Sequence, residues 1–164
     1  MAIYQIVKSD DEIIRQQAKE IVEVTPNICT LLDNLRDTLY ATSFGVGLAA
    51  PQIGISKRAI VVDIENELFE LINPMVIDQE GLAIDTEGCL SVPGIVGEVI
   101  RAKKVSIKAL NREGEVIVIA AEGLLARAFQ HEIDHLDGYL FVDRLSPAKR
   151  LLIKDQLKEI ESMV

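Results

Sequence analysis

The residues with the clearest chemical potential are the two histidines of the chain, which both lie in the pentapeptide HEIDH at residues 131–135. Residues four apart on a helix lie about one turn apart on the same face, so His131 and His135 could grip one metal ion. Glu132, beside a ligand, could then carry a proton. The alternative is structural, with two helical histidines that only donate hydrogen bonds to nearby carbonyl groups. The pentapeptide alone leaves both interpretations open.

A metal site of this kind needs a third protein ligand from another part of the chain. Because the chain has no third histidine, the candidates are a carboxylate further along and a thiolate. Cys29 lies beside Ile28 and Leu31, and we expect it to pack as a small hydrophobic residue. Cys89 follows Gly88, which would let the backbone turn and leave the sulfur open to the helix. Its alternative is also a small buried hydrophobe, but the polar surroundings favour Cys89 as a ligand.

Two neutral imidazoles and one thiolate would leave a divalent ion with a vacant tetrahedral position for water. Such an ion can lower the pKa of bound water toward about 7, which makes hydroxide available at neutral pH. The donor set therefore predicts a catalytic centre. A metal-stabilised binding protein without turnover would need a fourth protein ligand, and the sequence supplies no obvious one.

Composition limits the other classes of function. The 164 residues are 49% hydrophobic, which fits one domain spanning residues 1–164. A net charge of −9 argues against sequence-specific nucleic-acid binding. The start of the chain lacks the features of a secretory signal, and no apolar run approaches the length of a membrane span. Two cysteines are too few for a disulfide framework, so we expect a cytoplasmic protein without a membrane partner.

Apolar spacing near the start of the chain predicts two helices. The apolar positions of the first, in residues 11–24, are Ile13, Ile14, Ala18 and Ile21, with Ser9 or Asp10 as the N-cap. Thr25 and Pro26 supply a cap and a first-turn proline for a second, longer helix. Its apolar face consists of Ile28, Leu31, Leu32, Leu35 and Leu39.

The middle of the chain has the pattern of a sheet. Residues 43–54 contain glycines and break the helical periodicity, and residues 58–64 and 68–77 are then predicted to be strands. Residues 105–110 and 115–120 flank a polar turn, which is typical of an antiparallel hairpin.

Helical spacing returns in residues 123–136, which include the HEIDH motif, and Asp137 and Gly138 can close this helix. Ser146 and Pro147 open a last helix, whose expected docking residues are Leu151, Leu152, Leu157 and Ile160. The order of elements predicts an α+β fold. We expect mostly antiparallel sheets packed around a central HExxH helix, with N-terminal helices and a C-terminal helix.

Three segments together resemble the three motifs of peptide deformylases, in the same order and spacing. They are GVGLAAPQ at 45–52, EGCLS at 87–91 and QHEIDHLDG at 130–138. The likeness covers nearly the whole chain. It implies a metallohydrolase that removes the N-formyl group from the N-terminal methionine of new polypeptides, by attack of metal-bound hydroxide on the formyl carbonyl.

The resemblance also implies a role for individual residues. It implies that one divalent ion is bound by Cys89, His131 and His135. Glu132 would be the general acid and base, while the Gln52 side chain and the Leu90 amide would bind the oxyanion. The resemblance points to Fe²⁺ in cells, and the donor set also suits Zn²⁺, Ni²⁺ or Co²⁺.

A peptide substrate would, by the same resemblance, lie extended along an edge formed by Val46, Gly47 and Gly88. A simple turn is the alternative for the glycines of the first motif, and the absence of a following Gly-Lys-Ser/Thr excludes a phosphate-binding loop. Helical spacing also places three residues near His131 as candidates for the first side-chain pocket, namely Leu124, Arg127 and Ala128. Arg127 could lie at the rim of this pocket, where its aliphatic stem would cover apolar surface while its charged head reaches water. The alternative is an exposed arginine on the helix.

Three further interpretations concern an ion pair within the chain, a possible partner and a rival reaction. Arg101 could pair with Glu87 and brace the cysteine segment. Residues 144–164 carry five basic and three acidic side chains, which suit either a solvated helix face or a weak contact with ribosomal RNA. An HExxH metallopeptidase is the nearest rival enzyme, and an upstream cysteine as the third ligand argues against it.

Overall fold

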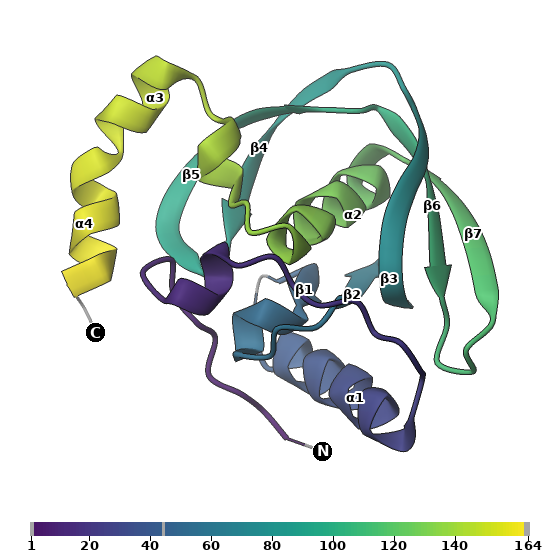
Figure 1. Cartoon of the computed structure of the whole chain (residues 1–164). Coiled ribbons are helices and arrows are strands. Elements are labelled where there is room, and N and C mark those ends of the chain that lie inside the picture. The colour runs from purple at the N-terminus through teal and green to yellow at the C-terminus, as the bar shows by residue number, and fades with distance from the viewer. Residues whose placement is uncertain (1, 44, 163–164) are drawn as a thin grey trace.

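A central helix, α2 (Gly123–Leu136), lies between a five-stranded sheet and a separate two-stranded hairpin (Figure 1). The computed structural model describes residues 2–43 and 45–162, with side chains through residue 160. The sheet is antiparallel, in the order β1 (Gly47–Ala49), β2 (Ala59–Ile64), β3 (Glu67–Glu80), β6 (Lys104–Leu110) and β7 (Val116–Glu122). The hairpin consists of β4 (Ala83–Cys89) and β5 (Val92–Arg101). The α+β class predicted from the sequence is confirmed.

The predicted elements with strong periodicity are present in the structure. Helix α1 (Pro26–Tyr40) begins after Thr25, and α2 has the predicted bounds, with Asp137 as its C-cap and Gly138 next at φ 84°. Strands β6 and β7 form the predicted hairpin, with Lys104 opposite Glu122 and Leu110 opposite Val116. Strand β3 is longer than predicted, because it continues to Glu80 after a shift in register.

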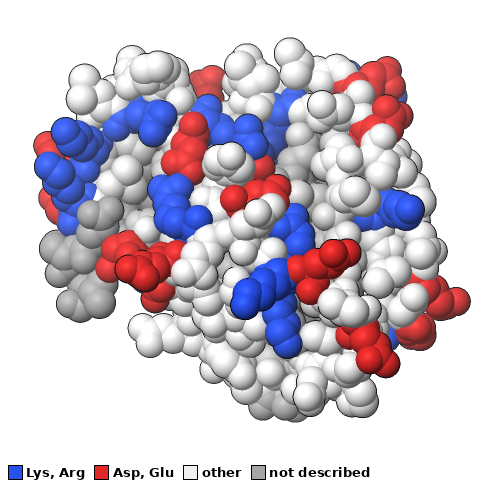
Figure 2. Space-filling view, viewed as in Figure 1, with Lys and Arg blue, Asp and Glu red and all other residues white. Residues whose placement is uncertain are grey.

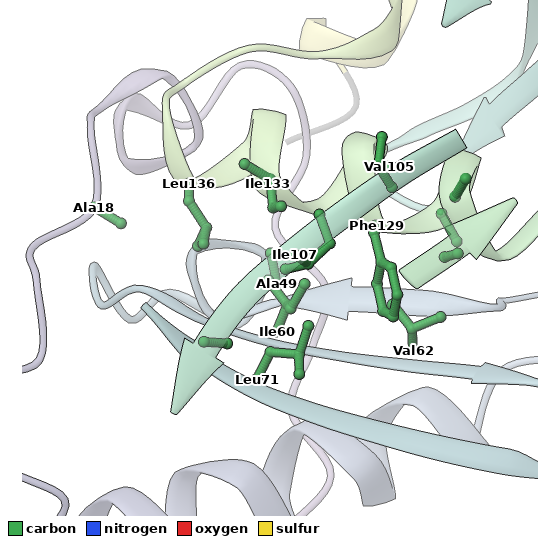
Figure 3. Close-up of a cluster of buried hydrophobic side chains, with 14 residues drawn as sticks. Ala18, Ala49, Ile60, Val62, Leu71, Val105, Ile107, Phe129, Ile133 and Leu136 are labelled. Atoms are coloured by element: carbon green, nitrogen blue, oxygen red, sulfur yellow. The ribbon is translucent and has the colours of Figure 1, made fainter. Parts of the chain in front are cut away.

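Two apolar layers cover the two faces of the main sheet. On one face, α2 packs Phe129, Ile133 and Leu136 against sheet residues such as Ile60 and Ile107 (Figure 3). On the other face, α1 buries the predicted leucines, and its cluster with the sheet includes Leu31, Leu32, Leu35, Leu39, Leu48, Val61 and Ile72. The main sheet therefore packs along one side of α2 and fixes the direction in which the HEIDH side chains point.

The β4–β5 hairpin was not predicted from the sequence. Its inward residues form a third cluster with the short helix η3 (Phe141–Arg144) and the end of the chain. Along β5, buried and exposed residues alternate, with Ile95, Val99 and Arg101 facing inward. This period of two is the strand signal, and the glycines at 94 and 97 obscure it in the sequence.

The helix predicted over residues 11–24 is wrong. Only η1 (Glu12–Arg15) forms, as a 3-10 turn capped by Asp11 rather than by Ser9 or Asp10. The following backbone is bonded to other segments instead: Ala18 N–H donates to Leu136 O at 2.7 Å, and Lys19 N–H donates to Ser56 O at 3.1 Å. Ile14, Ala18 and Ile21 are buried as expected, although they reach the core from an irregular segment.

The single C-terminal helix is also wrong in detail. Helix α3 (Pro147–Leu152), capped by the Ser146 hydroxyl, ends before Ile153, and α4 (Lys154–Ser162) follows. This break rotates the apolar face. Leu151 and Leu152, expected to dock, are 72% and 76% exposed, whereas Ile153 and Ile160 are buried.

Charges of both signs are interspersed on the face shown in Figure 2, and Lys and Arg side chains gather there over α3 and α4. Within the described ranges, no helix has the length and apolar character needed to cross a membrane.

Candidate metal centre

Helix α2 places the HEIDH side chains in the interior of the protein. His135 is 1% exposed and Glu132 is 4% exposed, while the His131 side chain is 11% exposed. The two imidazole rings lie one helical turn apart, with their centroids 5.0 Å from each other. Phe141, from η3, stacks on His131 at 6.2 Å. The helix therefore presents two imidazoles side by side, as the spacing predicted.

Cys89 lies at the end of β4, directly before a two-residue turn formed by Leu90 and Ser91. Its Sγ atom is 3.3 Å from His135 Nε2. The expected turn at Gly88 is wrong, because this residue is within the strand and has no positive φ. The cysteine is thus carried to the helix by the end of a strand.

The three donor groups of Cys89, His131 and His135 converge. One ligand atom from each lies within 4.8 Å of the other two. The cysteines are both free, and Cys29 lies elsewhere, with its Sγ donating to Arg112 O at 3.5 Å. Of the two thiols, only the Cys89 thiol reaches the histidine pair.

Glu87 orients His131 through a contact with one nitrogen of its ring. Its Oε1 atom is 2.9 Å from His131 Nδ1, which leaves Nε2 for the side of the ring that faces the other donors. The expected pairing of Arg101 with Glu87 is confirmed, and both side chains are buried, so this is no surface pair. Although burial raises the pKa of Glu87, its hydrogen bonds with Arg101 and His131 outweigh that effect and hold the pKa well below its usual range.

The pKa values of the two histidines of the cluster are shifted in opposite directions. Burial lowers the pKa of His131, but hydrogen bonds to Cys89 and Glu87 outweigh this and raise it well above its ordinary value. Burial, together with the nearby His131, lowers the pKa of His135 well below its ordinary value. Burial raises the pKa of Glu132 to about 7.

Gln52 reaches the cluster from the short helix η2 (Ala50–Ile53). Ala49 N–H donates to Gln52 Oε1 at 2.9 Å, so the amide nitrogen points away from β1 and toward Cys89 Sγ, which lies 3.7 Å from it. The same nitrogen donates to Ser91 Oγ at 3.2 Å. Gln52 is 1% exposed, and its side-chain orientation is therefore fixed by three neighbours.

A cavity of about 580 Å³ opens beside the cluster. Its lining includes all of the residues proposed from the sequence for substrate contact, namely Val46, Gly47, Gly88, Leu124, Arg127 and Ala128. It also includes Gln52, Leu90, Cys89, His131 and Glu132. His135 is buried and is not among the described residues that line the cavity.

Sequence reasoning missed one wall of this cavity and one partner of the cluster. The missed wall is made by Thr86 and by the start of β5, Val92, Pro93, Gly94, Ile95 and Val96. The apolar residues that follow EGCLS were the available signal. Glu87 was considered only as a partner of Arg101, because its contact with His131 joins residues that are 44 positions apart.

Gly47 explains why the first motif needs a glycine close to the cluster. A Cβ atom at this position would lie 2.7 Å from Glu132 Oε2 and 3.0 Å from Glu132 Cγ. Only a residue without a side chain leaves room for the carboxylate. Gly47, at the start of β1, therefore lies directly against Glu132.

The guanidinium group of Arg127 lies in neither of the two environments predicted from the sequence. The side chain is 7% exposed, so the alternative of an exposed helix arginine is wrong. Its guanidinium does not reach water, as a pocket rim would require, but donates to Glu87 Oε2 at 2.6 Å. Arg127 therefore belongs to the buried polar network as well as to the cavity wall.

The donor set fits a single divalent ion. A thiolate and two imidazoles are the donors that zinc, iron, cobalt and nickel accept in proteins, and their atoms lie close enough to share one ion. Glu132 Oε1 is buried and has no hydrogen-bond partner among the described residues, which leaves it available beside the cluster.

An α+β fold in which a helix and the end of a strand bring two imidazoles and a thiolate together beside a cavity is typical of a metal-dependent hydrolase. The polypeptide deformylase family model matches residues 3–151. The chain therefore belongs to the polypeptide deformylase family, and the resemblance found in its three motifs is confirmed.

Individual relatives agree with this assignment. Peptide deformylase from Carboxydothermus hydrogenoformans is 65% identical over 144 residues, which cover 88% of this chain and 94% of that protein. Peptide deformylase from Desulfitobacterium hafniense is 57% identical, with 92% and 99% covered. The crystal structure of a peptide deformylase from Legionella pneumophila matches with a TM-score of 0.91 at 44% identity, covering 99% of this chain and 97% of that one.

Proposed function

We propose that this chain removes the N-formyl group from the N-terminal methionine of newly synthesised polypeptides and releases formate. The observation that carries the proposal is the meeting of Cys89, His131 and His135 within 4.8 Å, beside a cavity that Cys89, His131 and Glu132 line. Such a cavity can hold the end of a peptide, and the donor set provides for hydrolysis.

Cys89, His131 and His135 would hold one divalent ion. When bound, such an ion would acidify a water molecule and polarise a carbonyl oxygen. We propose ferrous iron in cells, following the family resemblance, with zinc, nickel or cobalt as alternatives in purified protein. Elemental analysis after anaerobic purification tests this choice of metal.

Glu132 would carry the proton of the reaction. Its carboxylate lies on the cavity wall, adjacent in sequence to His131, so it can take a proton from the attacking water and pass it to the departing amine nitrogen. The Gln52 amide, aimed by its bond from Ala49, would donate to the oxygen of the formyl group as negative charge develops there. The Leu90 backbone amide, in the turn after Cys89, would be the second donor.

The substrate backbone would lie between two strand edges. Strands β1 and β4 are both at the edge of their sheets, and Val46, Gly47 and Gly88 line the cavity from these two sides. A peptide could pair there as an added strand, which would accept many sequences because only its backbone is bound.

The methionine side chain would enter the apolar part of the cavity. Leu124, Ala128 and the aliphatic stem of Arg127 form its wall on α2. We propose that residues 1–164 work as one catalytic domain, because the donors come from both α2 and the hairpin that it packs against.

We propose that the chain acts in the cytoplasm, because a free thiol that is to bind a metal is compatible with a reducing compartment. The positive side chains over α3 and α4 in Figure 2 are best accounted for by a solvated helix face, and a weak contact with ribosomal RNA is the alternative. Co-sedimentation with ribosomes over a range of salt concentrations separates these two proposals.

The decisive experiment is hydrolysis of a formyl-Met tripeptide, followed by measurement of formate and of the new amine. The controls are the same peptide without the formyl group and the same peptide with an acetyl group. We expect formate from the formyl peptide alone. Cleavage of internal peptide bonds would instead indicate a metallopeptidase, and no turnover with bound metal would indicate a binding protein.

A further inference from the structure

Arg127 connects α2 to both strands of the β4–β5 hairpin. It lies one helical turn before His131, and its guanidinium donates to Val99 O at 3.0 Å and to Ala83 O at 2.9 Å. The third acceptor is Glu87 Oε2 at 2.6 Å. One side chain thus ties the helix to main-chain atoms of β5, to main-chain atoms of β4, and to a buried carboxylate.

The Glu87 carboxylate is shared between three donors. Its Oε1 atom is 2.9 Å from His131 Nδ1 and accepts from Arg101 Nη2 at 2.9 Å. Its Oε2 atom accepts from Arg101 Nε at 2.7 Å and from Arg127. Loss of Arg127 would remove one of the two donors to Oε2, so that Arg101 Nε alone would hold this oxygen atom.

The position of Glu87 bears on the thiolate as well as on the imidazole. Glu87 and Cys89 are two residues apart near the end of β4, so a shift of this strand moves both side chains together. His131 and Arg127 are likewise four residues apart on one face of α2. The contact between Arg127 and Glu87 is therefore one of the links between the two elements that carry the donors, beside the contact of Glu87 with His131.

The second tie between these elements lies on the other side of His131. Arg101, from β5, donates to Asp134 Oδ2 at 2.7 Å, and Asp134 also accepts from Arg144 Nη2 at 2.8 Å. The C-terminal half of α2 is therefore held by its own pair of arginines. At the N-terminal half, Arg127 is the arginine that reaches the hairpin.

We propose that Arg127 is a positioning residue for the metal site: it holds the Glu87 carboxylate that orients His131, and it fixes the hairpin that ends in Cys89 against α2. The inference rests on the metal site proposed above. Groups that orient metal ligands in this way typically change metal affinity or activity by about 10–100-fold when they are removed.

The test compares Arg127→Met with the parent protein. Methionine keeps an unbranched stem along the cavity wall but removes all three donated hydrogen bonds. The metal-free proteins are titrated with Zn²⁺ in competition with a chromophoric chelator. We expect about a 10-fold weaker Zn²⁺ affinity. With formyl-Met peptide, kcat should fall while KM changes little.

Arg58→Met is the matched control. Arg58 Nη1 donates to Leu136 O at 2.9 Å and Nη2 donates to Asp137 Oδ1 at 2.9 Å, so it also braces α2, but at the far end from Glu87. We expect this variant to lower the melting temperature without a change in Zn²⁺ affinity. Arg127→Lys, which restores one donor, should recover part of the lost affinity.

The possible outcomes separate the inference from the proposed site. If Arg127→Met melts earlier, as Arg58→Met does, yet binds Zn²⁺ as tightly as the parent protein, Arg127 is only structural and the inference fails. If the parent protein itself binds no Zn²⁺, the proposed metal site fails instead. Should Arg127→Met not fold, Arg127→Lys decides, because unchanged Zn²⁺ affinity and kcat in that variant would overturn the inference.

Discussion

Replacement of Gly47 by alanine should disable Glu132 without removing it. The added Cβ atom would lie 2.7 Å from Glu132 Oε2, 3.0 Å from Cγ and 3.1 Å from Cδ, whereas ordinary contact begins at 3.4 Å. The carboxylate must therefore retreat by about 0.7 Å. Rotation of its oxygen atoms cannot relieve the contact, because Cγ and Cδ are also too close.

The expected loss in kcat is on the order of 10²-fold, since misplacement of a catalytic group by about 1 Å typically has that effect. Gly47 does not have a positive φ, so alanine adopts its backbone conformation and the effect is steric. Metal content should stay at the parent level, because the contacts of the new methyl group are with Glu132.

The assay measures kcat and KM with a formyl-Met tripeptide, together with bound metal and melting temperature. A double-mutant cycle with Glu132→Gln is the control. Once the carboxylate is gone, the alanine at position 47 should cost little further activity. A variant with parental kcat, or one whose KM rises while kcat is unchanged, would refute the reasoning, because the second result would mean that the methyl group obstructs the substrate.

Three other outcomes follow from the same geometry. Glu132→Gln should keep stoichiometric metal but lose about 10²–10⁴-fold in kcat, and elemental analysis beside the formate assay checks both; full activity would contradict its role. Cys89→Ala should weaken metal retention during dialysis against a chelator, since one of three ligands is lost; unchanged retention would remove this thiol from the site. The pKa of Asp33 is lowered, chiefly by a hydrogen bond from Arg112, so their pairing stabilises the fold above pH 3.8, and this contribution disappears as the pH falls through the lower folded-state pKa. The difference in melting temperature between the parent and Arg112→Met should therefore shrink on acidification, and a constant difference would argue against the pairing.

Periodic segments of the sequence were enough to predict much of the fold. Helices α1 and α2 and the β6–β7 hairpin were predicted because each buries one face, and that face is visible as a period of about 3.6 or 2. The N-terminal segment shows the limit of this argument. Ile14, Ala18 and Ile21 have helical spacing, yet the backbone after η1 bonds to distant segments, which local periodicity does not record.

The chemistry of the candidate site could likewise be predicted from the sequence only in part. The residue types and spacing of HEIDH and the scarcity of cysteine and histidine indicated Cys89, His131 and His135 as candidate ligands, and the family resemblance implied the same set together with the role of Glu132. Their proximity, the close contact of Gly47 with Glu132 and the burial of Arg127 against Glu87 depend on packing between β1, α2 and the β4–β5 hairpin. A sequence records which groups are present and their local period, whereas contacts between segments far apart in the chain exist only after the core has closed around them.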